Sequence, residues 1–282
     1  MPRPDRRLEN GRLAIHRHPL AVRLWHWLNL ACLLALLTSG LQIFNAHPAL
    51  YMGKASAFDR PVMAMTAVET STGGYRGVTR LFGRSWDTTG LFGASREGAD
   101  MADRGFPRWI TLPPGRDLAT GRRWHFFFAW IFVLNGAAYL VWGLGGRTRR
   151  ELWPSGAEIR GIGRQVWDHL RLRLPKGEAA RRYNVLQKLS YLAVLLVLLP
   201  LMVLTGLTMS PGMDAAAPWL PVLFGGRQTA RSIHFLTASG VVLFTLVHVA
   251  MVFAAGVINE MRSMITGRYV IDPREGSAEE RP

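Results

Sequence analysis

The hydrophobic positions of this chain fall into four long segments that are separated by polar stretches. Each segment has about twenty or more residues and almost no charge, the length that a helix needs to cross a hydrocarbon core of about 30 Å. The segments lie at 24–44, 124–144, 185–209 and 232–257. Pro200 should kink the third helix rather than end it, because a packed membrane bundle can satisfy the freed carbonyl. The pattern predicts an all-α membrane protein, a bundle of four transmembrane helices that forms a single domain over the whole chain.

The distribution of basic residues predicts how the helices are oriented. Arginines and lysines gather before the first apolar segment and in the connection at 145–184, whereas the connection between the third and fourth segments carries only Arg227 and Arg231. The basic residues of the two rich flanks are Arg3, Arg6, Arg7, Arg12, Arg17, Arg23, Arg147, Arg149, Arg150, Arg160, Arg164, Arg171, Arg173, Lys176, Arg181 and Arg182. The positive-inside rule then puts both termini and the 145–184 connection in the cytoplasm, and the stretch at 45–123 in the periplasm.

Net charge and cysteine content restrict the partners and cofactors that the chain is expected to bind. A formal net charge of +15 is compatible with nucleic-acid binding, but a nucleic-acid module does not need membrane-length apolar segments, so we expect no nucleic-acid partner. The single cysteine, Cys32, cannot form an intramolecular disulfide, and the chain has no C-x-x-C-H motif and no cysteine set for an iron–sulfur cluster. Any haem is therefore expected to bind non-covalently. The first segment is longer than the apolar part of a signal peptide, so we interpret it as a membrane span.

Four histidines lie inside the apolar segments: His26 in the first, His125 in the second, and His234 and His248 in the fourth. The last two are fourteen residues apart, so they share one helix face and are separated by about 21 Å along the axis. An imidazole inside a membrane is costly unless it is buried and partnered. The pattern indicates axial ligands for two b-type haems. The alternative is four unrelated polar residues packed inside a bundle.

Depth in the membrane predicts how these histidines pair. His26 lies near the cytoplasmic start of its helix, and His125 near the periplasmic start of the next. In the fourth helix His234 is close to the periplasmic end, and His248 is deeper, towards the cytoplasm. Matching depths pair His125 with His234 on the periplasmic side and His26 with His248 on the cytoplasmic side. A haem iron with two histidine ligands has no open position, which suits electron transfer.

Small and basic residues near the histidines are further candidates for haem contact. Gly40 lies fourteen residues after His26 and could admit the edge of the periplasmic haem, and Gly136 could do the same for the cytoplasmic haem. Ordinary close packing of membrane helices explains both glycines equally well. Arg23 and Arg123 could pair with haem propionates, or they could be anchors at the membrane interface.

A short sequence echo joins the first and third apolar segments. The first contains Thr38-Ser-Gly-Leu41 and the third contains Thr205-Gly-Leu207. The echo is too short to indicate a repeat.

The stretch at 45–123 is long for a connection between two membrane helices. It contains several turn signals but lacks the apolar periodicity of an independent core. A loop of this length is usually functional or disordered, and its Trp and Phe residues argue against simple disorder. We expect a cap that folds onto the bundle and offers a docking surface for a partner. The alternative is a passive lid over the haem.

The residues resemble a known family. Arg17-His-Pro-Leu-Ala-Val-Arg-Leu-Trp-His-Trp-Leu-Asn29 is similar to the first-helix motif of the bacterial cytochrome b561/Ni-hydrogenase cytochrome b family. The spacing from His234 to His248 is similar to that of the same family and of the formate dehydrogenase cytochrome subunit, and the resemblance extends to the tail at Met261–Tyr269. It implies a subunit of the bacterial inner membrane, with two haems, that passes electrons between the quinone pool and a peripheral oxidoreductase.

The long stretch at 45–123 separates this chain from the hydrogenase subunits of that family. It looks more like members that are associated with periplasmic molybdopterin oxidoreductases or thiosulfate-reductase-like systems. A hydrogenase partner remains an alternative, as do a self-sufficient reductase of the ferric or superoxide type and, from a different class, a haem-free transporter or assembly factor. The sequence leaves open whether the chain itself oxidises or reduces quinone. His16 and His18, just before the first segment, are expected at the surface, with a quinone contact as the alternative.

Overall fold

The computed structural model describes residues 5–9, 11–71, 73–144, 152–171 and 183–274. The chain divides into two compact units. Unit 1 comprises 1–28, 135–198 and 240–282, and unit 2 comprises 29–134 and 199–239. Each unit is described by itself below.

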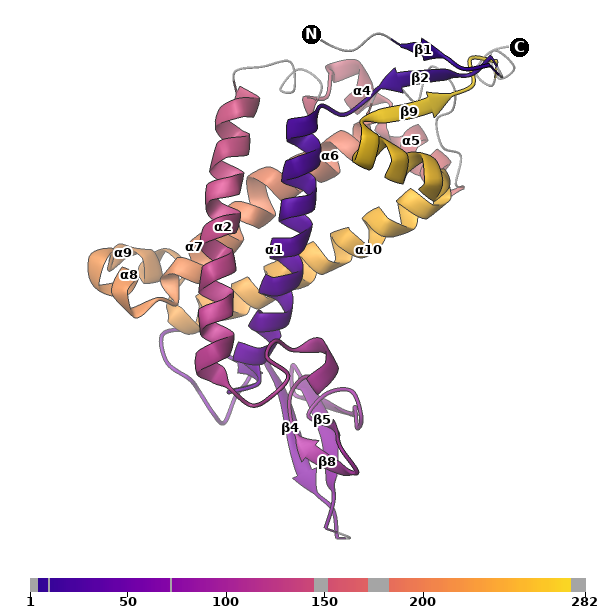
Figure 1. Cartoon of the computed structure of the whole chain (residues 1–282). Coiled ribbons are helices and arrows are strands. Elements are labelled where there is room, and N and C mark those ends of the chain that lie inside the picture. The colour runs from indigo at the N-terminus through magenta and orange to yellow at the C-terminus, as the bar shows by residue number, and fades with distance from the viewer. Residues whose placement is uncertain (1–4, 10, 72, 145–151, 172–182, 275–282) are drawn as a thin grey trace. The chain divides into compact units, whose positions relative to one another are not determined.

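Four helices are long and apolar enough to cross a membrane (Figure 1). They are α1 at Leu20–Phe44, α2 at Leu118–Leu144, a third formed by α6 at Val185–Ala193, a π-helical turn at Val194–Leu198 and α7 at Leu199–Thr208, and the 40-residue α10 at Arg227–Thr266. Large apolar side chains on them are mostly exposed, for example Trp130 at 65% and Leu246 at 64%. Exposed apolar faces of this extent are expected of helices that contact lipid. The four predicted spans are confirmed.

Three of the four long helices, α1, α2 and α10, begin before the predicted apolar segments. The α2 helix begins at Leu118, six residues before the predicted start. The Asp117 carboxylate accepts a hydrogen bond of 2.9 Å from the backbone N–H of Thr120, which is the geometry of an N-cap. A hydropathy pattern does not detect such a polar first turn.

Two breaks in the long helices have identifiable causes. The π-helical turn lies directly before Pro200, whose ring clashes with the carbonyl four residues earlier and whose nitrogen donates no hydrogen bond. The predicted distortion at Pro200 is therefore present as a widened turn. The second break is at Gly256 in α10, where φ is 104° and ψ is 86°. Only glycine adopts this region cheaply, and the break coincides with the predicted end of the fourth apolar segment.

Unit 1 contains a small antiparallel sheet that the sequence did not predict. Its strands are β1 at Arg6–Arg7, β2 at Leu13–His16 and β9 at Arg268–Ile271, in the order β1-β2-β9 (Figure 1). Ile15, Tyr269 and Ile271 form its buried core. The sheet joins the segment before α1 to the segment after α10.

Unit 2 contains a β-structure between α1 and α2, so the prediction of an all-α fold is wrong. The strands β3 at Ala49–Leu50, β4 at Met63–Glu69, β5 at Tyr75–Leu81 and β6 at Arg84–Asp87 form an antiparallel meander. The strands β7 at Ala94–Glu97 and β8 at Asp100–Asp103 form a hairpin, and a 3-10 turn follows at Arg108–Ile110 (Figure 1).

The α1–α2 segment has a core of its own, contrary to the prediction from its sequence. Phe44, Leu50, Met65 and Phe106 are buried together. Close backbone packing at glycine is also part of this core: a Cβ on Gly77 would lie 2.2 Å from the carbonyl oxygen of Phe92. A core built partly from such contacts leaves only a faint apolar periodicity, which is why the sequence pattern missed it.

Short helices complete the connections. In unit 1, α4 spans Gly156–Arg160 and α5 spans Ile162–Leu170, and Glu158 on α4 pairs with Lys188 on α6 at 2.7 Å. In unit 2, α8 spans Pro211–Ala216 and α9 spans Trp219–Leu223. Several basic residues that carried the orientation argument lie outside the described residues, namely Arg3, Arg147, Arg149, Arg150, Arg173, Lys176, Arg181 and Arg182.

Candidate functional site

The four membrane histidines lie in two pairs, one in each unit. In unit 2 the ring centres of His125 and His234 are 6.4 Å apart, at an interplanar angle of 63°. In unit 1 the ring centres of His26 and His248 are also 6.4 Å apart, at 56°. These are the two pairs that depth matching predicts.

The spacing of each pair fits a metal ion between two imidazoles. A metal–imidazole bond of about 2 Å and about 1 Å from the nitrogen to the ring centre, counted on both sides, give roughly 6 Å. The donor set is also suitable, because neutral imidazole is a common axial ligand of haem iron.

Hydrogen bonds fix which nitrogen of His125 is free. Its Nδ1 lies 3.1 Å from Ser39 Oγ. The Ser39 hydroxyl donates its one proton to the carbonyl of Ala35, at 2.5 Å, so it can only accept from His125. His125 therefore carries its proton on Nδ1, and the lone pair of Nε2 is available to a metal.

The same arrangement holds His234. Its Nδ1 lies 2.9 Å from Thr205 Oγ1, and that hydroxyl donates to the carbonyl of Leu201 at 2.6 Å. Thr205 must accept from Nδ1, which again leaves Nε2 of His234 available. Both hydroxyls come from a neighbouring helix, α1 for His125 and α7 for His234.

A glycine follows each of these hydroxyl residues and gives the imidazole room. A Cβ on Gly40 would lie 3.3 Å from Cε1 of His125, and a Cβ on Gly206 would lie 3.4 Å from Cε1 of His234. Contacts this short are tighter than ordinary packing. The similar sequences in the first and third apolar segments therefore form the same kind of contact. In each, a hydroxyl and the glycine that follows it, Ser39-Gly40 or Thr205-Gly206, contact one histidine.

The two glycines predicted to contact haem have different surroundings. Gly40 lies against the imidazole of His125, so its contact with a haem edge stays a prediction. A Cβ on Gly136 would meet nothing within 4 Å, so this position is open. Its contact with the other haem also stays a prediction.

The His26–His248 pair has a different environment. His26 Nδ1 is buried and has no hydrogen-bond partner in the described part of the chain, and His248 stacks on Phe244 with ring centres 5.9 Å apart. Arg23 donates to the carbonyl of Ile265, while its Nε is buried without a partner among those residues. Arg17 Nη1 lies 3.6 Å from Glu260 Oε1, and Arg17 Cζ lies 4.4 Å from the ring centre of Tyr269.

Arg123, the other basic residue predicted to pair with a propionate, lies at the surface. It is exposed, and its guanidinium donates to the hydroxyl of Thr120 at 3.4 Å and lies near the carboxylate of Asp117. Its pairing with a propionate stays a prediction.

The buried Arg104 is a residue of unit 2 that the sequence analysis did not select. Its side chain donates to the carbonyl of Phe106 and to the side chains of Gln42 and Thr111. It precedes His125 by twenty-one residues, and only the fold of the α1–α2 segment brings it to the end of α1. No local motif could have identified it.

Of the two histidines expected at the surface, His18 is buried, with 8% of its surface exposed. Burial, and then the charge of Arg17, lower its pKa to about 4. The expectation of a surface position is therefore wrong for His18, because the turn at Gly267 covers it: backbone N–H groups of Arg17 and His18 donate to the Gly267 carbonyl.

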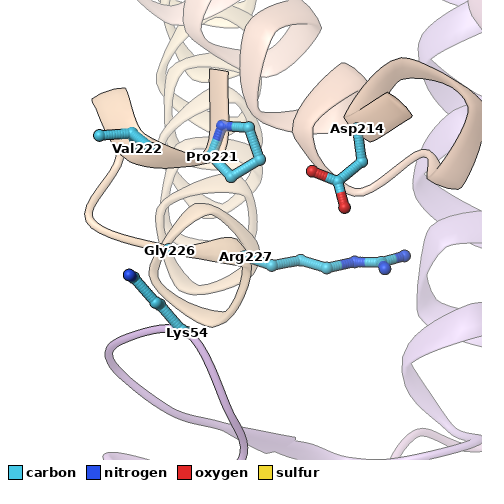
Figure 2. A pocket seen from close by; sticks show the side chains of 6 residues that line it. All are labelled: Lys54, Asp214, Pro221, Val222, Gly226 and Arg227. Carbon is cyan, nitrogen blue, oxygen red and sulfur yellow. The ribbon is translucent and has the colours of Figure 1, made fainter. Parts of the chain in front are cut away.

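A small pocket in unit 2 is separate from the histidines. It has a volume of about 210 Å³ and is lined by Lys54, Asp214, Pro221, Val222, Gly226 and Arg227 (Figure 2). Pockets for small molecules usually hold about 300 Å³ or more. The backbone of Gly53 accepts hydrogen bonds from Gln228 and Thr229 beside it, so the pocket marks where the α1–α2 segment is anchored to the start of α10.

Comparisons with known proteins place the chain in a family. The family model described as "Prokaryotic cytochrome b561" matches residues 17–267. A curated relative from Azospira oryzae, the "Putative protein-methionine-sulfoxide reductase subunit YedZ1", is 34% identical over 147 residues, which are 52% of this chain and 70% of the relative.

Proposed function

The chain belongs to the prokaryotic cytochrome b561 family, and we propose that it is a membrane electron-transfer subunit that holds two b-type haems. His125 and His234 would ligate one haem, and His26 and His248 the other. The observation that carries this proposal is the presence of two histidine pairs with the same ring separation of 6.4 Å. Bound haem supplies one-electron oxidation and reduction, and two histidines per iron leave no position for substrate.

The surroundings of the His26–His248 pair support a carboxylate-bearing group there. Arg23, three residues before His26, keeps its buried Nε without a hydrogen-bond partner in the residues that the structure describes. An unpaired buried donor of this kind is rare and costly, and a haem propionate would satisfy it. Arg17 offers less, because its Nη1 lies 3.6 Å from Glu260 Oε1.

The orientation follows from the charge distribution and agrees with one contact of unit 1. The β2–β9 pairing brings the segment before α1 to the segment after α10. An even number of spans requires both ends on one side of the membrane, and the positive-inside rule makes that side the cytoplasm. Single cysteines in a Cys32→Ser background test this: sites near Gly90 and Met213 should label from outside intact spheroplasts, and a site near Gly156 should not.

We infer that the partner is a periplasmic oxidoreductase, with a molybdopterin enzyme favoured over a hydrogenase. The relative from Azospira oryzae is named as a subunit of a protein-methionine-sulfoxide reductase. The β5–β6 hairpin offers a surface for such a partner, since Arg80, Arg84 and Trp86 are exposed on it and Phe82 at its turn is 78% exposed. Arginine and aromatic side chains are enriched at the centres of protein interfaces. At the His26–His248 haem, membrane quinol would be the source of electrons or membrane quinone their acceptor.

The experiment that tests the proposal is a difference spectrum. The purified chain should give a reduced-minus-oxidised spectrum of a b-type cytochrome, together with a haem content of two per chain. Reduction by a quinol analogue should reach both haems. A chain that is folded and membrane-inserted but carries no haem would instead favour the transporter or assembly-factor alternative.

A further inference from the structure

We propose that Arg104 binds a propionate carboxylate of the haem that His125 and His234 hold. This inference rests on the proposed function. It adds a cofactor-binding residue from the α1–α2 segment, a part of the chain outside the four membrane helices.

Three of the five N–H donors of Arg104 are occupied, and the two on Nη1 have no acceptor among the described residues. The side chain is 3% exposed. Nε donates to the Phe106 carbonyl at 2.9 Å, and Nη2 donates to Gln42 Oε1 at 3.0 Å and to Thr111 Oγ1 at 2.7 Å. Nη1 is buried and has no acceptor among the described residues. The guanidinium is thus held rigidly with one donor edge unused.

The charge of Arg104 is also unbalanced. Its three acceptors are neutral, and a guanidinium remains charged in proteins. Glu97 attracts it, whereas Arg108 and Arg116 repel it, and burial lowers its pKa. A buried charge without a close counter-charge is strongly destabilising, so the site needs an anion. A carboxylate suits the fork geometry of arginine.

The position of Arg104 connects this anion to the histidine pair. Gln42, which accepts from Arg104, lies three residues after Ser39, the partner of His125. The side chain of Gln42 also packs on Gly121, where a Cβ would lie 3.0 Å from its Cγ. Gly121 is one helical turn before His125, so Arg104 lies about one turn, roughly 5 Å along the axis, beyond the imidazole. The carboxylates of haem are at the rim of the macrocycle, away from the iron, and can reach a side chain one helical turn beyond the imidazole.

The amide of Gln42 is itself fixed in the orientation that this role requires. Its Nε2 donates to the carbonyl of Gly115 at 2.7 Å, so its oxygen faces Arg104. The α1–α2 segment thus presents the guanidinium from a preformed support. Arg123 differs, because it is exposed to solvent and its charge needs no counter-ion.

The test is a redox titration in a His26→Ala background, which on the proposed pairing keeps only the His125–His234 haem. Removing a buried cation beside a haem makes the added electron less favourable. Arg104→Gln should therefore shift the equilibrium towards oxidised haem by about tenfold, which is about 59 mV for one electron. Arg104→Lys should shift it less, because the charge remains. Arg108→Gln is the matched control: it removes a neighbouring exposed charge and should change the equilibrium by less than about twofold.

Esterified haem separates a propionate from any other anion, such as a lipid phosphate. Protein reconstituted with haem dimethyl ester lacks the carboxylate, so haem retention is the readout that separates the two: Arg104→Gln should weaken retention of ordinary haem by about tenfold and should weaken retention of the ester no more than Arg108→Gln does. An equal loss of retention with esterified haem would overturn the assignment to a propionate, as would a normal-haem redox shift no larger than the control. If Arg104→Gln does not accumulate, Arg104→Lys carries the same comparison with a smaller expected shift. Absence of haem from the unmodified chain would instead refute the proposed function.

Discussion

The two histidine pairs have the same ring separation but different surroundings. In unit 2 each histidine donates from Nδ1 to a hydroxyl of another helix, Ser39 or Thr205, and lies against a glycine. In unit 1 the Nδ1 of His26 has no partner in the described part of the chain, Arg23 three residues before it keeps an unused nitrogen, and the carboxylate of Glu260 acts on His248. One pair is thus preset in tautomer and ring position by its own helices, and the other has charged groups of both signs nearby.

This difference indicates that the two sites tune a bound metal in different ways. A hydrogen bond from the far ring nitrogen raises the basicity of an imidazole ligand and fixes its orientation. Nearby positive charge favours the reduced, less positive iron. The hydrogen bonds from Nδ1 should therefore lower the midpoint potential of the His125–His234 haem, and the charge of Arg104, on the assignment proposed above, should act in the opposite direction.

The largest expected effect is the loss of a whole haem. His26→Ala and His248→Ala should both lose the same haem, and His125→Ala and His234→Ala should both lose the other, because one ligand of each pair is removed. Haem content and redox titration of the four variants measure this. Loss of one common haem from the His26 and His125 variants would contradict the pairing.

The next effect concerns the hydroxyls of unit 2. Ser39→Ala and Thr205→Ala remove the acceptors of the two Nδ1 protons, so they should raise the midpoint potential of the His125–His234 haem and weaken its retention by about tenfold or more. Thr38→Ala is the matched control, because the Thr38 hydroxyl donates to carbonyls of its own helix, to that of Leu34 at 2.8 Å. The His26–His248 haem should be unchanged in all three variants. Equal shifts of both haems would mean that the hydroxyls act through the general fold.

A smaller effect is expected at the β5–β6 hairpin of unit 2. Replacing Arg80, Arg84 and Trp86 together with alanine should slow electron delivery to the periplasmic partner, while both haems keep their spectra and are still reduced by quinol. Arg96→Ala, on the neighbouring β7 strand, is a control for the loss of positive charge. If partner reduction keeps its wild-type rate in a haem-loaded triple variant, the hairpin is not the docking surface.

The smallest effect concerns the Glu158–Lys188 pair of unit 1. The hydrogen bond from Lys188, with that from the Ser155 backbone, lowers the pKa of Glu158 from 4.5 to about 2. Its contribution to stability is therefore present above pH 4.5 and is lost as the pH falls towards 2. Glu158→Gln should lower the Tm at neutral pH by an amount equivalent to about 1 kcal/mol or less. The difference from wild type should shrink below pH 4.5, and a difference that stays constant down to pH 2 would be incompatible with a role of this charge.

The membrane part of the fold could be predicted from the sequence because apolar length and histidine depth are local properties. The four spans and the adjacency of His26 to His248 and of His125 to His234 follow from them. The contacts that hold the imidazoles could not be predicted, because Ser39 and Thr205 contact a histidine of another helix and nothing in their own segments indicates this. The similarity between Thr38–Leu41 and Thr205–Leu207 was the one feature of the sequence that pointed to these contacts.

The β-structures were missed for a different reason. The α1–α2 segment builds its core from a few large side chains and from glycine contacts such as Gly77, so no strong alternation appears. The β1-β2-β9 sheet joins the two ends of the chain, and such pairing between distant short strands has no local signature. The burial of Arg104 depends on the fold of the α1–α2 segment, so it could not be predicted without that fold.

The most direct test of the account is the haem-to-protein ratio of the purified chain, measured together with the number of components in its redox titration. Two b-type haems per chain and two midpoint potentials, of which His125→Ala and His234→Ala remove the same one, are the predicted result. One haem per chain, or a spectrum with an open coordination position at either iron, would contradict the assignment of two haems with two histidine ligands each.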